Sequence, residues 1–189
     1  MVRGTNRANA LDNLTRLLKA IGEAVEYDKK PCIFISHQRA DIEECEKVAE
    51  YLIGAGIDVY LDKYDKTLEQ LAQEGNPDKL TQRLQKGIDN STHMICVVST
   101  ATIKSYWVPF EVGYGYRHII LGILTLKGID DADLPDYMKT TKVIRGTKSL
   151  NTFVAELLGT KGQVLEEQHV IKSYTAARHP LDDVLDWNR

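Results

Sequence analysis

The sequence predicts an α/β fold: a doubly wound, mostly parallel sheet of five strands with helices on both faces. Two observations carry this prediction. Five short apolar runs recur along the 189-residue chain, and stretches with apolar residues at three- and four-residue steps separate them. Strands that alternate with helices in this way form parallel sheets, because a crossover helix returns the chain to the same edge of the sheet before each new strand.

The first strands and the helix between them follow from their apolar patterns. Cys32 to Ile35 is a short continuous apolar run, which is typical of a strand buried on both faces. From Asp41 an apolar stripe with helical spacing runs to Leu52, and Gly54-Ala55-Gly56 ends it. Ile57 to Leu61 then alternates between apolar and polar residues and predicts the second strand.

The stretch from Asp62 to Pro77 is polar and is long for a connection between two elements. It has room for a short helical turn around Leu68 and Leu71. Long connections in compact domains often carry function. The remaining predicted elements are a helix marked by Leu80, Leu84 and Ile88, a strand over Met94–Val98, a helix over Ser105–His118, a strand over Ile119–Leu126, a strand over Lys142–Ile144 and a helix over Leu150–Leu158.

Right-handed crossovers make the flavodoxin-like strand order 2-1-3-4-5 the default for this pattern. We expect one core domain over residues 31–158. Residues 1–30 form an N-terminal extension with an amphipathic helix from Leu11 to Val25. Residues 159–189 form a polar C-terminal extension, in which one apolar stripe comprises Leu181, Val184 and Leu185.

Composition excludes several classes of protein. The formal net charge is -3, with 43% hydrophobic and 27% charged residues, which is typical of a soluble globular domain and not of a general nucleic-acid binder. No apolar run approaches the roughly 20 residues that a membrane span needs, and no secretory signal opens the chain. The three cysteines lie in apolar surroundings without the spacing of metal ligands, so we expect reduced core residues in a cytoplasmic protein: Cys32, Cys45 and Cys96. Metal ligation by them is a weaker alternative.

Ligands of such sheets bind outside the carboxyl ends of the strands, where the strand order reverses. In the predicted order this point lies between the first and third strands. The loops there predict these substrate-binding residues: Ser36, His37 and Arg39 after the first strand, Asp62 after the second and Ser99 after the third. A hydroxyl, an imidazole and a guanidinium ahead of a helix favour a phosphate-bearing ligand. Ordinary capping of that helix by Ser36 or Asp41, with Arg39 solvated, explains the same residues.

Trp107 and Glu111 are four residues apart and are predicted to project from one face of the helix after the third strand. Pro109 fits the first turn of that helix, which places both residues near the carboxyl edge of the sheet. An aromatic plate beside a carboxylate suits a flat cationic ring attached to a sugar. On spacing alone, an equally good interpretation is that Trp107 belongs to the core and that Glu111 is a favourable charge near a helix N-terminus.

The sequence contains none of the common motifs for other kinds of site. We find no phosphate-binding loop, nucleophile elbow or zinc motif. The acidic residues Asp130, Asp131 and Asp133 favour a solvated loop over a metal site. We therefore expect neither a metal nor a resident cofactor.

Five segments, taken in order, carry a family resemblance: Cys32-Ile33-Phe34-Ile35-Ser36-His37, Val59-Tyr60-Leu61-Asp62, Leu84-Gln85-Lys86-Gly87-Ile88, Ile95-Cys96-Val97-Val98-Ser99, and Ser105-Tyr106-Trp107 with Glu111 four residues after the tryptophan. Together they resemble a TIR (Toll/interleukin-1 receptor) domain over about two-thirds of the chain, roughly residues 31–158. Each segment alone is a weak signal, and their order and spacing together are fairly specific.

The resemblance implies the flavodoxin-like fold that the apolar patterns predict independently. It also implies the activity of bacterial NAD-consuming TIR domains, which cleave the bond between nicotinamide and ribose, with NAD as substrate. By resemblance, Glu111 is the catalytic glutamate and Trp107 packs against the nicotinamide end. His37 and Arg39 line the same cleft, and Asp62 lies at the side of the so-called BB loop.

The resemblance also implies partners. TIR domains assemble through TIR–TIR contacts, so a homo-oligomer is expected. Free-standing TIR proteins of this kind are similar to the signal-making component of Thoeris antiviral systems, which acts on a separate effector through a nucleotide product. The chain departs from the commoner pattern in its BB loop, which is long and charged with Gly75 as its one glycine. That departure bears on how the domain assembles.

Two other functions fit parts of the sequence. A non-catalytic TIR interaction module would use the BB loop for homotypic contacts, and Glu111 would be structural. A nucleoside deoxyribosyltransferase-like enzyme would also use a carboxylate, but it would turn over deoxynucleosides and leave NAD untouched. Turnover of NAD distinguishes the first function from both alternatives, and turnover of deoxynucleosides distinguishes the transferase from the interaction module.

Overall fold

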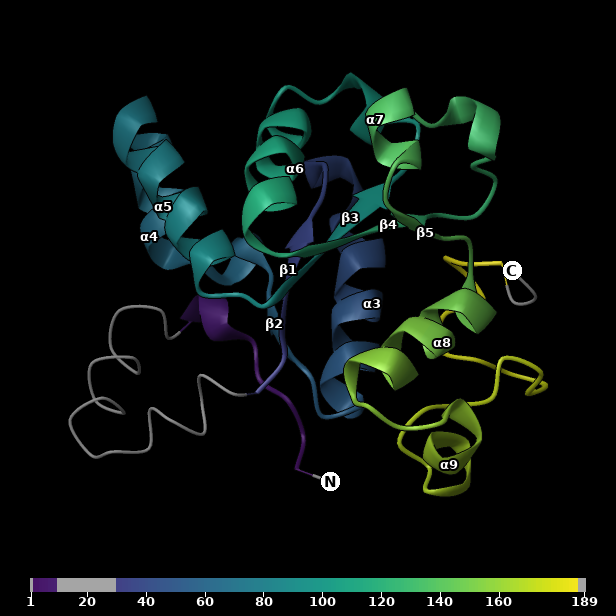
Figure 1. The fold of residues 1–189 in the computed structure, drawn as a ribbon. Coiled ribbons are helices and arrows are strands. Elements are labelled where there is room, and N and C mark those ends of the chain that lie inside the picture. The colour runs from purple at the N-terminus through teal and green to yellow at the C-terminus, as the bar shows by residue number, and fades with distance from the viewer. Residues whose placement is uncertain (1, 10–29, 187–189) are drawn as a thin grey trace.

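A computed structural model gives the structure of residues 2–9 and 30–186. It contains one parallel sheet in the order β2-β1-β3-β4-β5, which confirms the predicted fold and strand order (Figure 1). The strands are β1 (Cys32–Ser36), β2 (Asp58–Tyr60), β3 (His93–Val98), β4 (Ile120–Thr125) and β5 (Lys142–Ile144). The predicted helix from Leu11 to Val25 lies outside the described residues.

Helices cover both faces of the sheet (Figure 1). One face packs against α3 (Ile42–Gly54) and α8 (Thr147–Leu157), and the other against α5 (Pro77–Asp89) and α6 (Trp107–His118). Successive strand side chains point to opposite faces, so Ile33 and Ile35 belong to the first core and Phe34 to the second. Gly115 of α6 approaches β3 so closely that a Cβ there would lie 2.6 Å from Met94 Cε, which is the close helix packing expected for a glycine on a buried face.

The segment after β2 is mainly helical, whereas the sequence predicted a polar loop with a single turn. It comprises the short helix η3 (Asp62–Tyr64) and α4 (Lys66–Gln73), and α5 follows. Asp65 caps α4 by accepting hydrogen bonds from the N–H groups of Thr67 and Leu68, both at 3.1 Å. Asn76 caps α5 in the same way, ahead of Pro77. The caps and the spacing of a few leucines define these helices, although their exposed residues are polar.

The later elements include two short helices that the sequence did not predict. They are α7 (Asp136–Lys139) and α9 (Gly162–Glu167), which are too short to show an apolar period. α8 begins at Thr147, ahead of the predicted start at Leu150, and the remaining short helices are η1 (Arg7–Asn9), η2 (Arg39–Asp41), η4 (Thr102–Lys104) and η5 (Asp131–Asp133).

Residues 4–8, here called the N-terminal strap, lie along the outer edge of β2. The N–H of Gly4 donates to Ile53 O at 2.8 Å, and the N–H of Val59 donates to Thr5 O at 2.9 Å. The buried Arg7 guanidinium binds Asp58 at 2.9 Å between Nε and Oδ2. A Cβ at Gly4 would lie 1.9 Å from Ile57 O, so only glycine fits this approach. The strap therefore occupies the edge of the sheet at β2.

Residues 170–186, here called the C-terminal segment, pack across α3 and α8. The predicted apolar stripe Leu181, Val184 and Leu185 is buried in the core on that side. The N–H of Lys127 donates to Val184 O at 2.9 Å, and the N–H of Thr147 donates to Asp186 O at 2.7 Å. These bonds bring the segment to the loops that follow β4 and β5.

All three cysteines are buried and free of disulfide bonds. Within residues 2–9 and 30–186, no helix is long and apolar enough to cross a membrane. Over the same ranges, no three histidine, cysteine or acidic side chains gather as metal ligands would. The acidic residues of the loop after β4 make other contacts: Asp131 forms an ion pair with Arg145, and Asp133 accepts the N–H of Asp130.

Candidate active site

The loops after β1 and β3 meet at the carboxyl edge of the sheet, where the strand order reverses. The two strands are neighbours, with Ser36 of β1 in register with Cys96 of β3. Ser36 is the last residue of β1 and faces the same side as Phe34, toward α6. The fold therefore turns its hydroxyl toward the helix that carries Glu111.

Ser36 and Glu111 form the closest contact in the candidate site. The Ser36 hydroxyl donates to Glu111 Oε2 at 2.5 Å. Glu111 lies on the buried face of α6 with Val108, Val112 and Gly115, and only 5% of its surface is exposed. A carboxyl group held this far from water needs such a partner.

Burial raises the pKa of Glu111 from 4.5 to about 8. The hydrogen bond from Ser36 lowers the pKa, and the nearby charge of Asp62 raises it further. At neutral pH the carboxyl group is therefore mostly protonated in the free protein. A strongly perturbed carboxyl group at the carboxyl edge of the sheet is a candidate for a functional group.

His37 and Asp62 form the second contact. His37 Nε2 lies 3.5 Å from Asp62 Oδ1, and His37 Nδ1 lies 3.1 Å from Ile35 O. The imidazole is almost fully buried, whereas 31% of the Asp62 side chain is exposed. Burial raises the pKa of Asp62, and the neighbouring imidazole lowers it. Asp62 therefore reaches the site from the start of η3 while keeping access to water.

Ser99 links the loop after β3 to the start of α3. Its hydroxyl donates to Asp41 Oδ2 at 2.7 Å and accepts the N–H groups of Ala101 and Thr102. Thr102 also donates to Asp41 Oδ2, at 3.1 Å. Asp41 makes no side-chain cap to α3, and Ser36 donates to Glu111, so neither acts as the ordinary helix cap considered from the sequence. Asp41 instead ties together the two loops that flank the site.

Arg39 and Trp107 are more exposed than the other predicted site residues. Arg39 opens η2 at the surface, with its N–H bound to Gln38 Oε1. Trp107 is the first residue of α6 and is 42% exposed, with its ring 6.0 Å from that of Phe110. Spacing predicted one face for Trp107 and Glu111. Their exposures differ because Trp107 begins the helix at the edge of the sheet, whereas Glu111 lies one turn deeper.

A buried cluster that the sequence did not predict lies next to η3, which carries Asp62. Arg83 of α5 binds both carboxylate oxygens of Asp65, with Nε–Oδ2 at 2.6 Å and Nη2–Oδ1 at 3.0 Å. The Tyr60 hydroxyl donates to Asp65 Oδ2 as well. Arg83 lies three residues after Leu80 and one before Leu84, on the apolar stripe of α5. A cation on that stripe needs a buried partner, and this is the signal that could have found the cluster.

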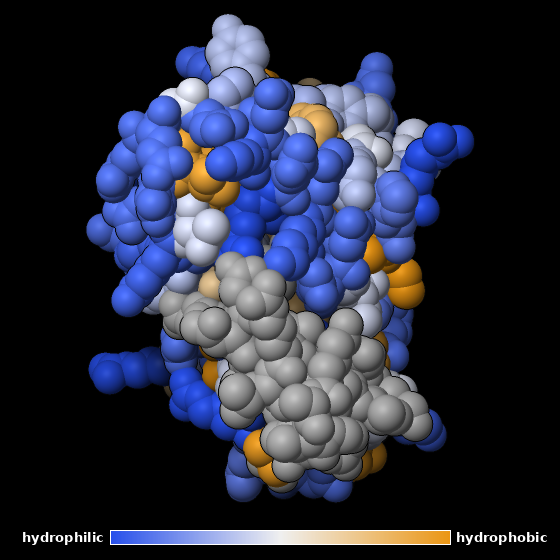
Figure 2. Space-filling view, turned by 90° about the vertical axis from the view of Figure 1, so that its left-hand side faces the viewer, coloured by the Kyte–Doolittle hydropathy of each residue, from blue (hydrophilic) through white to orange (hydrophobic). Residues whose placement is uncertain are grey.

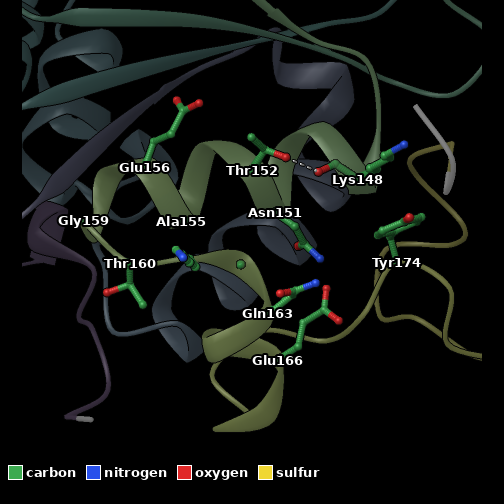
Figure 3. Close-up of a pocket in the computed structure, with 12 residues that line it drawn as sticks. Lys148, Asn151, Thr152, Ala155, Glu156, Gly159, Thr160, Gln163, Glu166 and Tyr174 are labelled. Atoms are coloured by element: carbon green, nitrogen blue, oxygen red, sulfur yellow. Dashed lines mark hydrogen bonds between the residues drawn. The ribbon is translucent and has the colours of Figure 1, made fainter.

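Two open pockets lie away from these residues. One, with a volume of about 570 Å³, lies between α8, α9 and Tyr174 of the C-terminal segment (Figure 3). The other, of about 480 Å³, is bordered by Lys127, Tyr174 and Asp186. None of the seven predicted site residues lines either pocket. In the first pocket the Asn151 side chain is already engaged, because it binds the Tyr51 hydroxyl and Lys172 O.

The site thus joins a buried carboxyl group, a hydroxyl and an imidazole–carboxylate pair at the edge where this type of sheet binds ligands. Such a set can stabilise a positive charge and hold hydroxyl groups. A search of curated proteins finds no match to the chain. The TIR domain family model matches residues 33–153, which is more than half of the chain and contains every predicted site residue. The chain therefore belongs to the TIR domain family.

Proposed function

We propose that the protein is an NAD glycohydrolase or ADP-ribosyl cyclase that cleaves the nicotinamide–ribose bond of NAD, with Glu111 as the catalytic carboxylate. One observation carries the proposal: a nearly buried glutamate, paired with Ser36 and close to Asp62, lies at the carboxyl edge of the sheet in a TIR domain.

The reaction breaks the bond between the ribose carbon and the pyridinium nitrogen, and nicotinamide leaves as a neutral molecule. The bonding electron pair returns to the ring nitrogen, so the leaving group needs no proton. The ribose develops the positive charge of an oxocarbenium ion, which a carboxylate close to it stabilises. Water as nucleophile gives ADP-ribose and a proton, whereas an internal nucleophile gives a cyclic isomer of ADP-ribose. Glu111 supplies the negative charge in either case.

The raised pKa of Glu111 agrees with a cationic substrate. In the free protein the carboxyl group is mostly protonated below about pH 8. A pyridinium ring placed beside it favours the ionised form, because an opposite charge lowers the pKa of a carboxyl group. Binding of NAD would therefore release a proton and prepare the carboxylate. A neutral deoxynucleoside has no such charge, which favours NAD over a deoxyribosyltransferase substrate.

We further propose that the product serves as a nucleotide signal to a separate effector in bacterial antiviral defence, and that the active form is a homo-oligomer. The signalling role rests on the resemblance stated from the sequence, and the proposed assembly rests on membership of the TIR domain family. Arg39 and Trp107 are exposed at the edge of the site, where they can meet a substrate or a neighbouring subunit.

One observation favours a rival function, a non-catalytic interaction module. Tyr106, which directly precedes Trp107 at the start of α6, is 96% exposed, as a residue for protein contacts would be. Incubation with NAD and, separately, with deoxynucleosides decides between the candidates, with the protein concentration raised in steps to allow assembly. Release of nicotinamide supports the proposal. Cleavage of deoxynucleosides alone supports the transferase, and inert substrates at every concentration support the interaction module.

A further inference from the structure

Asp65 is buried three residues after Asp62 and accepts five hydrogen bonds. Its Oδ1 receives the N–H groups of Thr67 and Leu68 and Nη2 of Arg83. Its Oδ2 receives Nε of Arg83 and the hydroxyl of Tyr60. A carboxylate with this many donors, and only 1% of its surface exposed, has a fixed position and orientation.

The packing of β2 against α5 holds two of these donors, Tyr60 and Arg83, in place. The Tyr60 ring is stacked on Phe34, with centroids 5.2 Å apart, and it fills the space left by Gly87 of α5, where a Cβ would lie 2.8 Å from the Tyr60 ring. Arg83 lies one turn before Gly87 on the same helix. The missing side chain at Gly87 thus lets α5 approach β2 closely enough for Arg83 to reach Asp65.

The chain connects this cluster directly to the candidate site. The N–H of Asp65 donates to Asp62 O at 2.7 Å, which closes the turn of η3. The other side-chain contacts of η3 lie nearer the surface, where Glu46 binds Lys63 and Tyr64. Exposed ion pairs contribute little to rigidity, whereas a buried bidentate pair restricts its partners strongly. The face formed over α4 and α5 is largely hydrophilic, so the buried cluster lies beneath a polar surface (Figure 2).

We propose that Arg83 is a positioning residue: through Asp65 it fixes η3 so that the Asp62 carboxylate stays against His37 in the candidate site. This inference rests on the proposed function for its consequence in catalysis. Its structural part, the dependence of the Asp62–His37 contact on Arg83, does not. In this proposal Arg83 acts through Asp65.

The structural part is tested without substrate in the full chain. Arg83→Met and Tyr60→Phe remove donors to Asp65, while Arg83→Lys retains the charge without the two-point contact. Val154→Ala, in the core on the opposite face of the sheet, is a control that lowers stability elsewhere. We expect the imidazole ¹⁵N shifts of His37 at fixed pH to change in Arg83→Met, and amides 62–68 to exchange about tenfold faster. Arg83→Lys should show intermediate changes, and Val154→Ala should show neither.

The catalytic part is tested by a double-mutant cycle with Asp62→Asn. If Arg83 acts through Asp62, Arg83→Met lowers kcat/KM on the order of 100-fold in the native background and much less in Asp62→Asn. Equal losses in both backgrounds overturn the proposal. The proposal is also overturned if the His37 shifts and the exchange of amides 62–68 are unchanged in folded Arg83→Met. If Arg83→Met does not fold, the same measurements on Arg83→Lys decide. Absence of NAD turnover in the native protein contradicts the proposed function and leaves the spectroscopic test to decide on Arg83.

Discussion

Replacing Glu111 by glutamine should stabilise the protein, and the gain should grow with pH. Because Glu111 has a pKa of about 8 in the folded protein and 4.5 ordinarily, the folded state holds a proton that the unfolded state loses above pH 4.5. Stability from this group is complete below pH 4.5 and is lost as the pH rises toward 8. Glutamine does not ionise, so the variant avoids this loss.

The size of the gain follows from the two pKa values. Each pH unit between them corresponds to about 1.4 kcal/mol, so the free energy of unfolding of Glu111→Gln should exceed that of the native protein by up to about 5 kcal/mol at pH 8 and above. At pH 7 the gain should be about 3 kcal/mol, and near pH 4.5 about zero. The Ser36 hydroxyl can still pair with the amide, so the hydrogen bond is not a separate loss.

Urea unfolding at a series of pH values between 4.5 and 8.5 measures this difference. Glu69→Gln, on the exposed side of α4, is the matched control and should change stability by less than about 0.5 kcal/mol at every pH. A Glu111→Gln variant whose stability follows that of the native protein at all pH values would contradict the assigned burial and protonation. A destabilised variant at pH 8 would contradict it more strongly.

Three further predictions concern Glu111, Asp41 and His179. The kcat/KM for NAD should rise with pH up to about 8, because that is the pKa of Glu111 in the free protein. The kcat should reach its plateau at a lower pH, because the bound cation favours the ionised carboxylate. Profiles of rate against pH measure both quantities. Asp41→Ala should lower the free energy of unfolding by about 1–3 kcal/mol, because it removes the acceptor of the Ser99 and Thr102 hydroxyls, and an unchanged urea midpoint would contradict this role. Burial lowers the pKa of His179, whose Nδ1 accepts the N–H of Leu181, so stability from this group is complete above pH 6.5 and is lost as the pH falls through the lowered pKa. Thermal unfolding at pH 5 and pH 7 should therefore show a smaller difference for His179→Gln than for the native protein.

The sheet could be predicted because most residues of β1 to β4 are buried on both faces. The continuous apolar run from Cys32 to Ile35 indicates by its composition alone that the strand is covered on both faces. Five predicted strands with helices between them then permit few topologies. The region after β2 was harder to predict. Its helices begin at Asp65 and Asn76, whose capping roles depend on local hydrogen bonds that an apolar period does not reveal.

The sequence predicted where the candidate site residues lie in the sheet better than it predicted their contacts. The order of the strands brings the loops after β1 and β3 together, so Ser36 and Glu111 could be placed at one edge from the sequence. Their hydrogen bond depends on the rotation of α6, which the close approach of Gly115 to Met94 helps to fix. The position of Arg83 on the apolar stripe of α5 indicates that it has a buried partner. That the partner is Asp65 follows only from the packing of α5 on β2.

We propose that cleavage of NAD depends on the buried carboxyl group of Glu111. The most direct test is mass-resolved chromatography of NAD after incubation at pH 8 with the native protein and, in parallel, with Glu111→Gln of verified fold. We expect nicotinamide together with ADP-ribose or a cyclic isomer from the native protein, and unchanged NAD from the variant. Equal turnover by both proteins would contradict the role of Glu111, and unchanged NAD with both at every protein concentration would favour the interaction module.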